Sequence, residues 1–347
     1  MTAKNPDNEK QHYVPEVVLA IYAEGAGKNK LCVFDKHTGR TFPGPTAVKK
    51  LCKEGGFYNA EAAHGRVSLE KAFHQLEQEY RDITAKVIAK RSLAPLSRED
   101  FGTLVGFVCV QYLRVPRLRK AFEQFNRLIA DKARAIAPKA ESRQEFELGD
   151  NELRLRHLEV IARGALEGTR ILADYAWFVM ETDPNQPFWI SDCPVVINND
   201  EKSIYASLGF AAPGVQIYFP ITPSLLLVCW HPVVAGRFLE ERDRHRKTLN
   251  QLKGEYVLGV KGNKASIKTA IDEMEVALKP VGDIVAAIES GGSVKASADD
   301  VLHFNWLQFQ WSHRFILCAE GEFAEATKML KDHPELRTGI AIKPARL

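Results

Sequence analysis

Long hydrophobic runs and paired cysteines are both missing from this chain of 347 residues. No apolar stretch approaches the roughly 18 residues that a membrane-spanning helix needs, so we expect no membrane partner. The first seven residues are polar and lack the apolar core of a signal peptide. Six cysteines are scattered without a Cys-x-x-Cys pair, which is typical of free thiols in a reducing compartment and argues against a cysteine-based zinc site. We therefore expect a cytoplasmic protein.

The signature motifs of several enzyme classes are also missing. The chain has no Gly-x-x-x-x-Gly-Lys-Ser/Thr loop, no usable Gly-x-Gly-x-x-Gly, no His-Glu-x-x-His and no Gly-x-Ser-x-Gly. Gly25-Ala26-Gly27-Lys28 lacks the spacing and the final hydroxyl of a phosphate loop. A net charge of +3 with a pI near 8.4 permits a nucleic-acid or nucleotide partner without requiring one.

The distribution of apolar residues predicts an α+β fold. We expect an N-terminal β-hairpin with a strand over Leu31–Asp35, a helical part over about 68–173, a β-rich part over about 175–232 with long-range strand pairing, and a closing C-terminal helix that runs into a strand at Phe315–Cys318. Residues 237–275 are charged and predicted to be helical only in part.

The domain prediction is a disordered tail over 1–10 followed by a single domain over 11–347, with a mobile linker over 138–151. Within the helical part, Ser97 followed by acids predicts a helix start, because a hydroxyl accepts from the free N–H groups of a first turn. The apolar helix that follows should end or kink at Pro116.

Five short strings place polar side chains among apolar ones and are therefore the candidate site segments. They are Gln11–Pro15, Gln111–Arg117, Ser191–Val195, Phe219–Pro223 and Asn305–Phe315.

His12 and Glu77 are candidate catalytic residues and metal ligands. A neutral imidazole can ligate a metal or act as a general base, but a histidine that orders the N-terminus through backbone hydrogen bonds is an equally physical interpretation of His12. Glu70 and Glu77 are seven residues apart and so share one helix face with Phe73. A carboxylate on such a stripe needs a partner or a metal, unless it lies at the exposed edge of the stripe.

Gln111, Arg114 and Arg117 lie at the end of the most apolar predicted helix. Arginine offers a planar fork that suits phosphate, so Arg114 and Arg117 are predicted to bind substrate and Gln111 to act beside them. The alternative is structural: cations favour helix C-termini, and Arg114 would then pair with Glu77 or Asp192.

Asp192 follows the apolar run Phe188–Ile190, and acids at strand ends are common active-site positions. It is the third predicted metal ligand; the alternative is a turn in which Asp192 accepts from nearby backbone N–H groups. Asn305 and Gln308 share one face of the last helix, where buried amides imply a hydrogen-bonded network or a ligand. Asn305 and Arg314 are predicted to bind substrate.

The order of these strings resembles a bacterial family catalogued only as a domain of unknown function, number 4238. The matching features are the Gln-His-Tyr-Val-Pro start, the hairpin Val33–Gly39, Phe57-Tyr58, Gln-x-x-Arg-x-Pro-Arg at 111–117, and Ser-Asp-x-Pro-Val at 191–195. The resemblance spans about residues 11–320. It implies a bacterial protein and is compatible with a role in defence against phages, but it implies little about activity.

Two main hypotheses follow. In the first, the protein is a metal-dependent phosphodiester hydrolase, a nuclease, in which His12, Glu77 and Asp192 hold Mg²⁺ or Mn²⁺. In the second, it is a non-catalytic sensor or adaptor, and the same polar residues form a structural network or a pocket for a small ligand or partner. A nucleotide-using transferase without a metal is a third interpretation.

Overall fold

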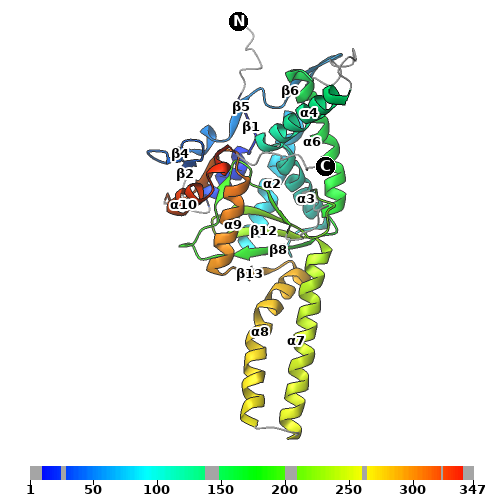
Figure 1. Ribbon diagram of the computed structural model, residues 1–347, viewed down its shortest axis with the longest axis vertical. Helices are drawn as coiled ribbons and strands as arrows, with labels where there is room; N and C mark the ends of the chain where they lie inside the picture. The colour runs from blue at the N-terminus through cyan, green and yellow to red at the C-terminus, as the bar shows by residue number, and fades with distance from the viewer. Residues whose placement is uncertain are drawn as a thin grey trace.

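Helices packed around two β-sheets form the body of the protein, and a long helical hairpin projects from it (Figure 1). The structure is a computed structural model and describes residues 10–24, 29–136, 148–199, 209–259, 264–321 and 323–338. Helices and mostly antiparallel strands confirm the predicted α+β class.

The central sheet has the strand order β10-β11-β12-β8-β13. All its pairs are antiparallel except β8 with β13. Neighbouring side chains of a strand point to opposite faces of the sheet. Both faces of the central sheet are covered by other elements. Phe219 packs against the rings of Tyr80 and Phe107 on one face, whereas Tyr218 packs against Phe304 on the other. The strands are β8 (Ala176–Glu181), β10 (Val196–Asn199), β11 (Val215–Thr222), β12 (Leu225–Trp230) and β13 (Ser293–Lys295).

The second sheet, here called the terminal sheet, joins three stretches that are far apart in the sequence. Its order is β3-β2-β14-β9, with β4 paired to β2. The pairing of β14 with β2 confirms the predicted long-range strand pairing. These strands are β2 (Lys30–Asp35), β3 (Arg40–Thr41), β4 (Thr46–Ala47), β9 (Ile190–Ser191) and β14 (Phe315–Cys318), and two small pairs complete the sheets: β1 (Lys10–His12) with β5 (Lys53–Gly55), and β6 (Asn59–Ala62) with β7 (Gly65–Ser68).

The helical part follows the predicted order with sharper boundaries. Ser97 caps α3 and forms a reciprocal capping box with Asp100. Pro116 opens α4 rather than kinking α3, since proline is tolerated at the first helical position, where no intrahelical N–H bond is lost. The helices of the body are α1 (Glu16–Glu24), α2 (Glu70–Lys90), α3 (Arg98–Leu113), α4 (Pro116–Ile136), α6 (Asp150–Leu172), α9 (Ala298–Trp311) and α10 (Ala324–Asp332), with short 3-10 turns η2 (Val48–Lys50) and η3 (Pro334–Thr338).

Two predicted segments fall mainly on residues outside the described ranges. The predicted tail 1–10 is described only at Lys10, which belongs to β1. The predicted linker 138–151 is described from residue 148, and α6 already begins at Asp150.

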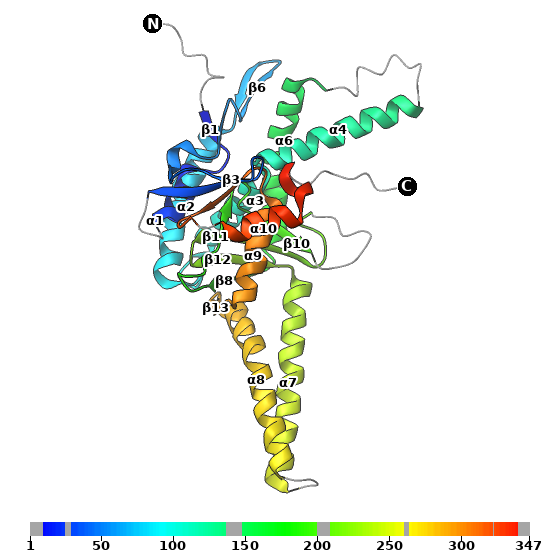
Figure 2. The same cartoon turned by 60° about the vertical axis from the view of Figure 1, so that its left-hand side comes forward.

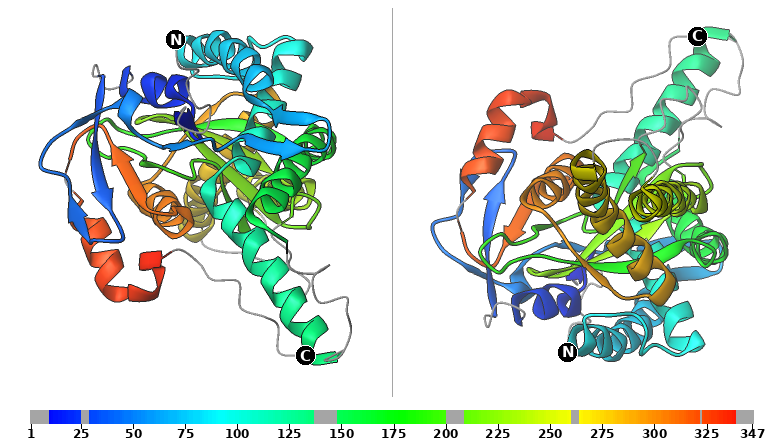
Figure 3. Two further views of the ribbon diagram at one scale, coloured as in Figure 1. Left: turned by 90° about the horizontal axis from the view of Figure 1, so that it is seen from above. Right: turned by 90° about the horizontal axis from the view of Figure 1, so that it is seen from below.

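The projecting hairpin consists of α7 (Pro232–Leu258) and α8 (Lys264–Ser290), and both views along its length show it standing clear of the body (Figure 2). Seen from below, its helices lie side by side (Figure 3). Each has 27 residues and is therefore about 40 Å long. An ion pair of 2.6 Å between Lys253 and Glu275 joins them. Residues 237–275 were predicted to be helical only in part, and within their described part all except Gly259, which ends α7, are helical.

His157 of α6 is a buried junction residue from which a pH dependence follows. Its Nε2 lies 3.0 Å from the Leu113 carbonyl oxygen, and the Arg119 Nε–H donates to its Nδ1. Burial, and then the charge of Arg119, lower the pKa of His157 to about 4. The unfolded chain, with an ordinary histidine pKa of about 6.5, therefore binds more protons between these values, so stability must fall as pH falls through this window.

We expect the free energy of unfolding to fall by about 3 kcal/mol as the pH falls from about 6.5 to about 4, because His157 binds a proton in the unfolded chain but not in the folded one. Urea unfolding of the native chain and of His157→Gln at several pH values measures it. Glutamine keeps a donor and an acceptor but does not titrate, so its pH profile should be flatter. Parallel profiles of the two proteins would contradict the assignment.

Candidate functional site

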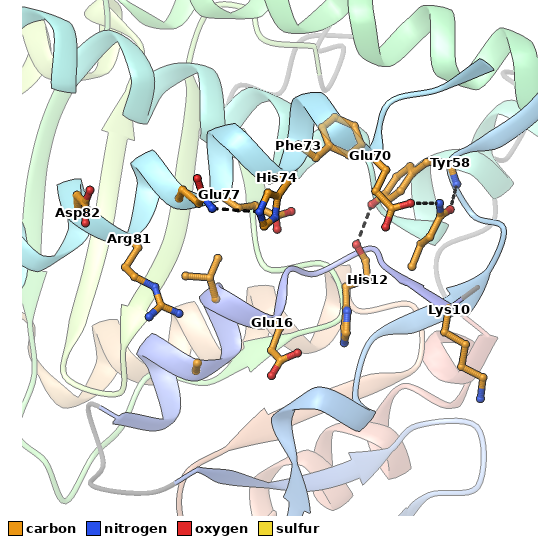
Figure 4. Close-up of a pocket in the computed structure, with 14 residues that line it drawn as sticks. Lys10, His12, Glu16, Tyr58, Glu70, Phe73, His74, Glu77, Arg81 and Asp82 are labelled. Atoms are coloured by element: carbon orange, nitrogen blue, oxygen red, sulfur yellow. Dashed lines mark hydrogen bonds between the residues drawn. The ribbon is translucent and has the colours of Figure 1, made fainter. Parts of the chain in front are cut away.

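A cavity of about 770 Å³ lies between β1 and α1 on one side and α2 on the other (Figure 4). It is the candidate functional site, because polar and charged side chains from both sides line it. The lining residues are Lys10, Gln11, His12, Glu16, Val17, Ala20, Tyr58, Glu70, Phe73, His74, Glu77, Gln78, Arg81 and Asp82.

The local sequence explains why these residues meet. Glu70, His74, Glu77 and Arg81 follow one another at steps of three and four residues, so α2 presents them on a single face. The opposite wall is placed by β1, which pairs with β5 in antiparallel register, with His12 opposite Lys53. Figure 4 shows His12 and Glu16 across the cavity from the α2 side chains.

Gln11 ties the two walls together at one end of the cavity. Its Nε2 donates to Glu70 Oε2 and to Asn59 Oδ1, and its Oε1 accepts from the Tyr58 backbone N–H at 2.6 Å. The Tyr58 hydroxyl donates to the His12 carbonyl oxygen at 3.1 Å. Gln11 belongs to the predicted site segment Gln11–Pro15, although no role was assigned to it. Asn59 and Tyr58 were not predicted as site residues, and the signal for Tyr58 was the Phe57-Tyr58 pair among the family features.

His12 is neutral at neutral pH in this environment. Burial is the largest effect and lowers its pKa below the ordinary value, while the carboxylate of Glu16 opposes that effect. Its Nε2 is buried and has no hydrogen-bond partner among the described residues. A neutral ring with a free nitrogen can accept or donate one hydrogen bond, which is compatible with either a ligand contact or a general base.

Arg114 lies behind the α2 wall and is fully buried, with an exposed fraction of 0%. Its Nη1 donates to Glu77 Oε1 at 2.8 Å and its Nε to Gln111 Oε1 at 2.9 Å. The guanidinium also lies over the rings of Phe73 and Phe107, at 5.1 and 5.6 Å from their centroids. Arg114 therefore holds Glu77 in place, and Glu77 neutralises it.

Gln111 is equally buried and connects α3 to the N-terminal segment. Its Nε2 donates to the Tyr13 carbonyl oxygen at 3.1 Å, and its Oε1 orients Arg114. The structure thus brings four predicted residues together: His12 and Glu77 line the cavity, and Gln111 and Arg114 stand behind it.

Asp192 is not among the residues that line this cavity. It is fully buried, and its two oxygens accept the backbone N–H groups of His313, Arg314 and Phe315 at 2.7, 2.7 and 2.9 Å. Burial raises the pKa of Asp192, and the three N–H donors oppose that rise. Asp192 thus accepts backbone N–H groups, but they belong to residues 313–315 and not to the nearby turn that the alternative interpretation predicted.

The other predicted binding residues are engaged in the same region as Asp192. The Arg117 guanidinium stacks on Trp311 at 3.8 Å from the ring centroid and donates to the Gln310 carbonyl oxygen. Asn305 accepts from the Trp189 N–H and donates to the Pro187 carbonyl oxygen, so it fastens α9 to the segment before β9. Arg314 pairs with Asp35 at 2.7 Å.

The predicted metal ligands are therefore divided between two places in the fold. Over the described ranges, no group of three or more His, Cys, Asp and Glu side chains is placed to hold a metal ion. His12 and Glu77 line the cavity, and Asp192 lies outside it.

The fold and the cavity define an α+β protein with a polar cavity between its N-terminal segment and a long helix. The chain belongs to the family described as Protein of unknown function (DUF4238), whose model matches residues 10–321. The comparisons give no match among curated proteins and none among solved structures. Among the described helices, none is both long and apolar enough to cross a membrane.

Proposed function

We propose that the protein is a non-catalytic sensor or adaptor that binds a small, positively charged, polar molecule in the α1–α2 cavity. The observation that carries this proposal is the carboxylate content of the cavity wall. Glu16 of α1 and Glu70, Glu77 and Asp82 of α2 line it, against only Lys10 and Arg81 as cations.

These carboxylates fall into two kinds. Glu70 and Glu77 already have internal partners in Gln11 and Arg114. Glu16 and Asp82 are exposed and form no ion pair within the described part of the chain. The first kind shapes the wall, and the second is available to a ligand that carries an ammonium or guanidinium group, since such donors form charge-assisted hydrogen bonds with carboxylates. The neutral ring of His12 adds no repulsion to a cation.

Thermal-shift measurements with a diamine and with a guanidinium compound test this proposal. A ligand that binds only the folded protein raises the melting temperature by mass action, and saturation at about 100 times Kd corresponds to about 2.7 kcal/mol. We expect a concentration-dependent rise that is lost in the double variant Glu16→Gln, Asp82→Asn. Both side chains are exposed, so the variant should fold normally.

The matched control is Glu273→Gln on the projecting hairpin, which removes an exposed carboxylate far along the chain from the cavity. It should respond like the native protein. Equal shifts in all three proteins would mean general screening of an acidic surface, and no shift with either compound would also contradict the proposal.

A metal-dependent phosphodiester hydrolase acting on nucleic acid or a nucleotide is the second candidate. One observation favours it: His12 and Glu77 line the same cavity. The same thermal-shift series with Mn²⁺ and Mg²⁺ against a chelator, on the native chain and on His12→Ala, tests it. A metal-specific rise that His12→Ala abolishes, with metal-dependent cleavage of a nucleic acid, would favour the hydrolase over the binding protein.

A further inference from the structure

A second cavity, of about 900 Å³, lies where the projecting hairpin joins the body (Figure 1). We call it the root cavity. It is lined by Tyr218 and Trp230 of the central sheet, Phe238 of α7, Ile284 of α8 and Phe304 of α9. Its volume lies in the range of about 300–1,000 Å³ that is typical of small-molecule sites. The root cavity shares no lining residue with the α1–α2 cavity and is therefore a separate place in the fold.

The aromatic side chains of the root cavity form two packed pairs. Trp230 and Phe238 stack with their ring centroids 4.9 Å apart and their planes at 23°. Tyr218 and Phe304 lie with their centroids 4.7 Å apart and their planes at 45°. Each pair joins a strand of the central sheet to a helix, so the rings are held in place before any ligand binds. Such a wall suits a planar ring, because aromatic rings attract one another in offset or edge-to-face arrangements.

The polar atoms of these rings are already engaged within the protein. The Trp230 indole N–H donates to the Tyr218 hydroxyl at 3.2 Å, and that hydroxyl donates to Gln216 Oε1 at 2.6 Å. A molecule that packs against this wall therefore gains chiefly by removing apolar surface from water, and it needs no hydrogen bond there.

The mouth of the root cavity is polar and carries both signs of charge. Lys279 and Asp283 of α8 and His303 of α9 line the cavity and are exposed. Lys279 and Asp283 form no ion pair within the described ranges. A polar substituent of either charge would find a counterpart at this mouth. The ring, and not the charge, is therefore the feature that the cavity selects.

We propose that the root cavity binds a small molecule with a planar aromatic ring, which packs against the paired rings while its polar substituent lies at the mouth. Trp230 belongs to the sheet and Phe238 to the hairpin, so the bound ring links the hairpin to the body. This proposal is independent of the α1–α2 cavity, which is lined mainly by polar and charged side chains.

The experiment is a titration of the full chain with indole, indole-3-acetate and tryptamine, followed by calorimetry and by the melting temperature. The three compounds share one ring system, so they distinguish a neutral, an acidic and a basic ligand. Cyclohexanol is the saturated comparison. Tryptamine is measured on the Glu16→Gln, Asp82→Asn background, because the α1–α2 cavity is itself proposed to bind a cation. Hydrogen exchange locates the site: bound indole should slow amide exchange around Ile284 in α8 and leave that around Glu77 in α2 unchanged.

Two variants alter the root cavity in different ways. Ala286→Trp introduces a large side chain from an exposed position of α8 that lines the cavity, so it should fill the space while the chain still folds. The matched control is Ala265→Trp, at an exposed position near the start of the same helix and away from the cavity. Phe238→Leu keeps an apolar side chain but removes one ring of a stacked pair. Circular dichroism confirms that each variant is folded.

We expect indole to bind the native chain and Ala265→Trp alike, and to bind Ala286→Trp at least about tenfold more weakly, because the space that it needs is filled. Phe238→Leu should reduce the preference for indole over cyclohexanol by roughly two- to tenfold, which is the size of one lost ring contact. The proposal is overturned if indole does not bind the native chain, if the two tryptophan variants bind it equally well, or if exchange slows in α2 instead of α8. Because indole is uncharged, failure of the α1–α2 cavity proposal would leave these outcomes unchanged.

Discussion

Replacing Asp192 by alanine is expected to lower the free energy of unfolding by about 4 kcal/mol. The substitution removes both oxygens that accept from His313, Arg314 and Phe315, and these N–H groups begin the return of the chain from α9 into β14. A hydrogen bond to a charged group contributes about 1.5–3 kcal/mol, and partial relaxation of the turn reduces the sum. The buried Lys36 would also lose the carboxylate charge that opposes the lowering of its pKa by burial.

Chemical unfolding followed by circular dichroism measures this loss. Asp192→Asn is the graded comparison, since its amide keeps one acceptor oxygen and should recover part of the stability. A stable Asp192→Ala protein that had lost its response to Mn²⁺ or Mg²⁺ would instead support the ligand role predicted from the sequence.

Replacing Glu77 by alanine should cost about 3–5 kcal/mol, because it leaves the fully buried Arg114 without its only ion-pair partner in the described structure. Gln111 would still orient the guanidinium but carries no charge. The converse change, Arg114→Met, should cost less, since Glu77 is partly exposed, with 24% of its side-chain surface accessible, and water can solvate it.

A double-mutant cycle separates these effects. If the pair is the source of the loss, adding Arg114→Met to Glu77→Ala should restore stability relative to Glu77→Ala alone, because a buried uncompensated charge is replaced by an apolar side chain. Strict additivity of the two single changes would show that Glu77 and Arg114 act independently. Glu79→Ala, an exposed residue of the same helix, is the matched control.

Much of the fold was readable from local chemistry. Ser97 with Asp100 marked the start of α3, and the turn after Asp35 marked the hairpin of β2 and β3. The projecting hairpin was missed for a physical reason. Two helices that pack only on each other need no more than a narrow apolar stripe, and Leu249 is the one described residue of α7 beyond its root that is buried. Charged residues are frequent in both helices, and Pro280 lies inside α8.

The candidate site was predicted in part. Periodicity placed Glu70 and Glu77 on one face of α2, and the string around His12 led to the facing wall. Periodicity in the sequence could not predict the environment of the Asp192 carboxylate. A carboxylate after a strand can face a solvent-filled cavity or a buried turn, and the outcome depends on residues 313–315, more than a hundred positions later in the chain.

The connection of the projecting hairpin to the central sheet leaves its length free to vary. It leaves from β12 and returns to β13, which flank β8, so its two ends lie near each other on the central sheet. Paired insertions or deletions of whole helical turns in α7 and α8 would shift the tip by about 5.4 Å per turn without altering a strand register or a cavity wall. Related chains could therefore differ widely in reach while keeping the same body.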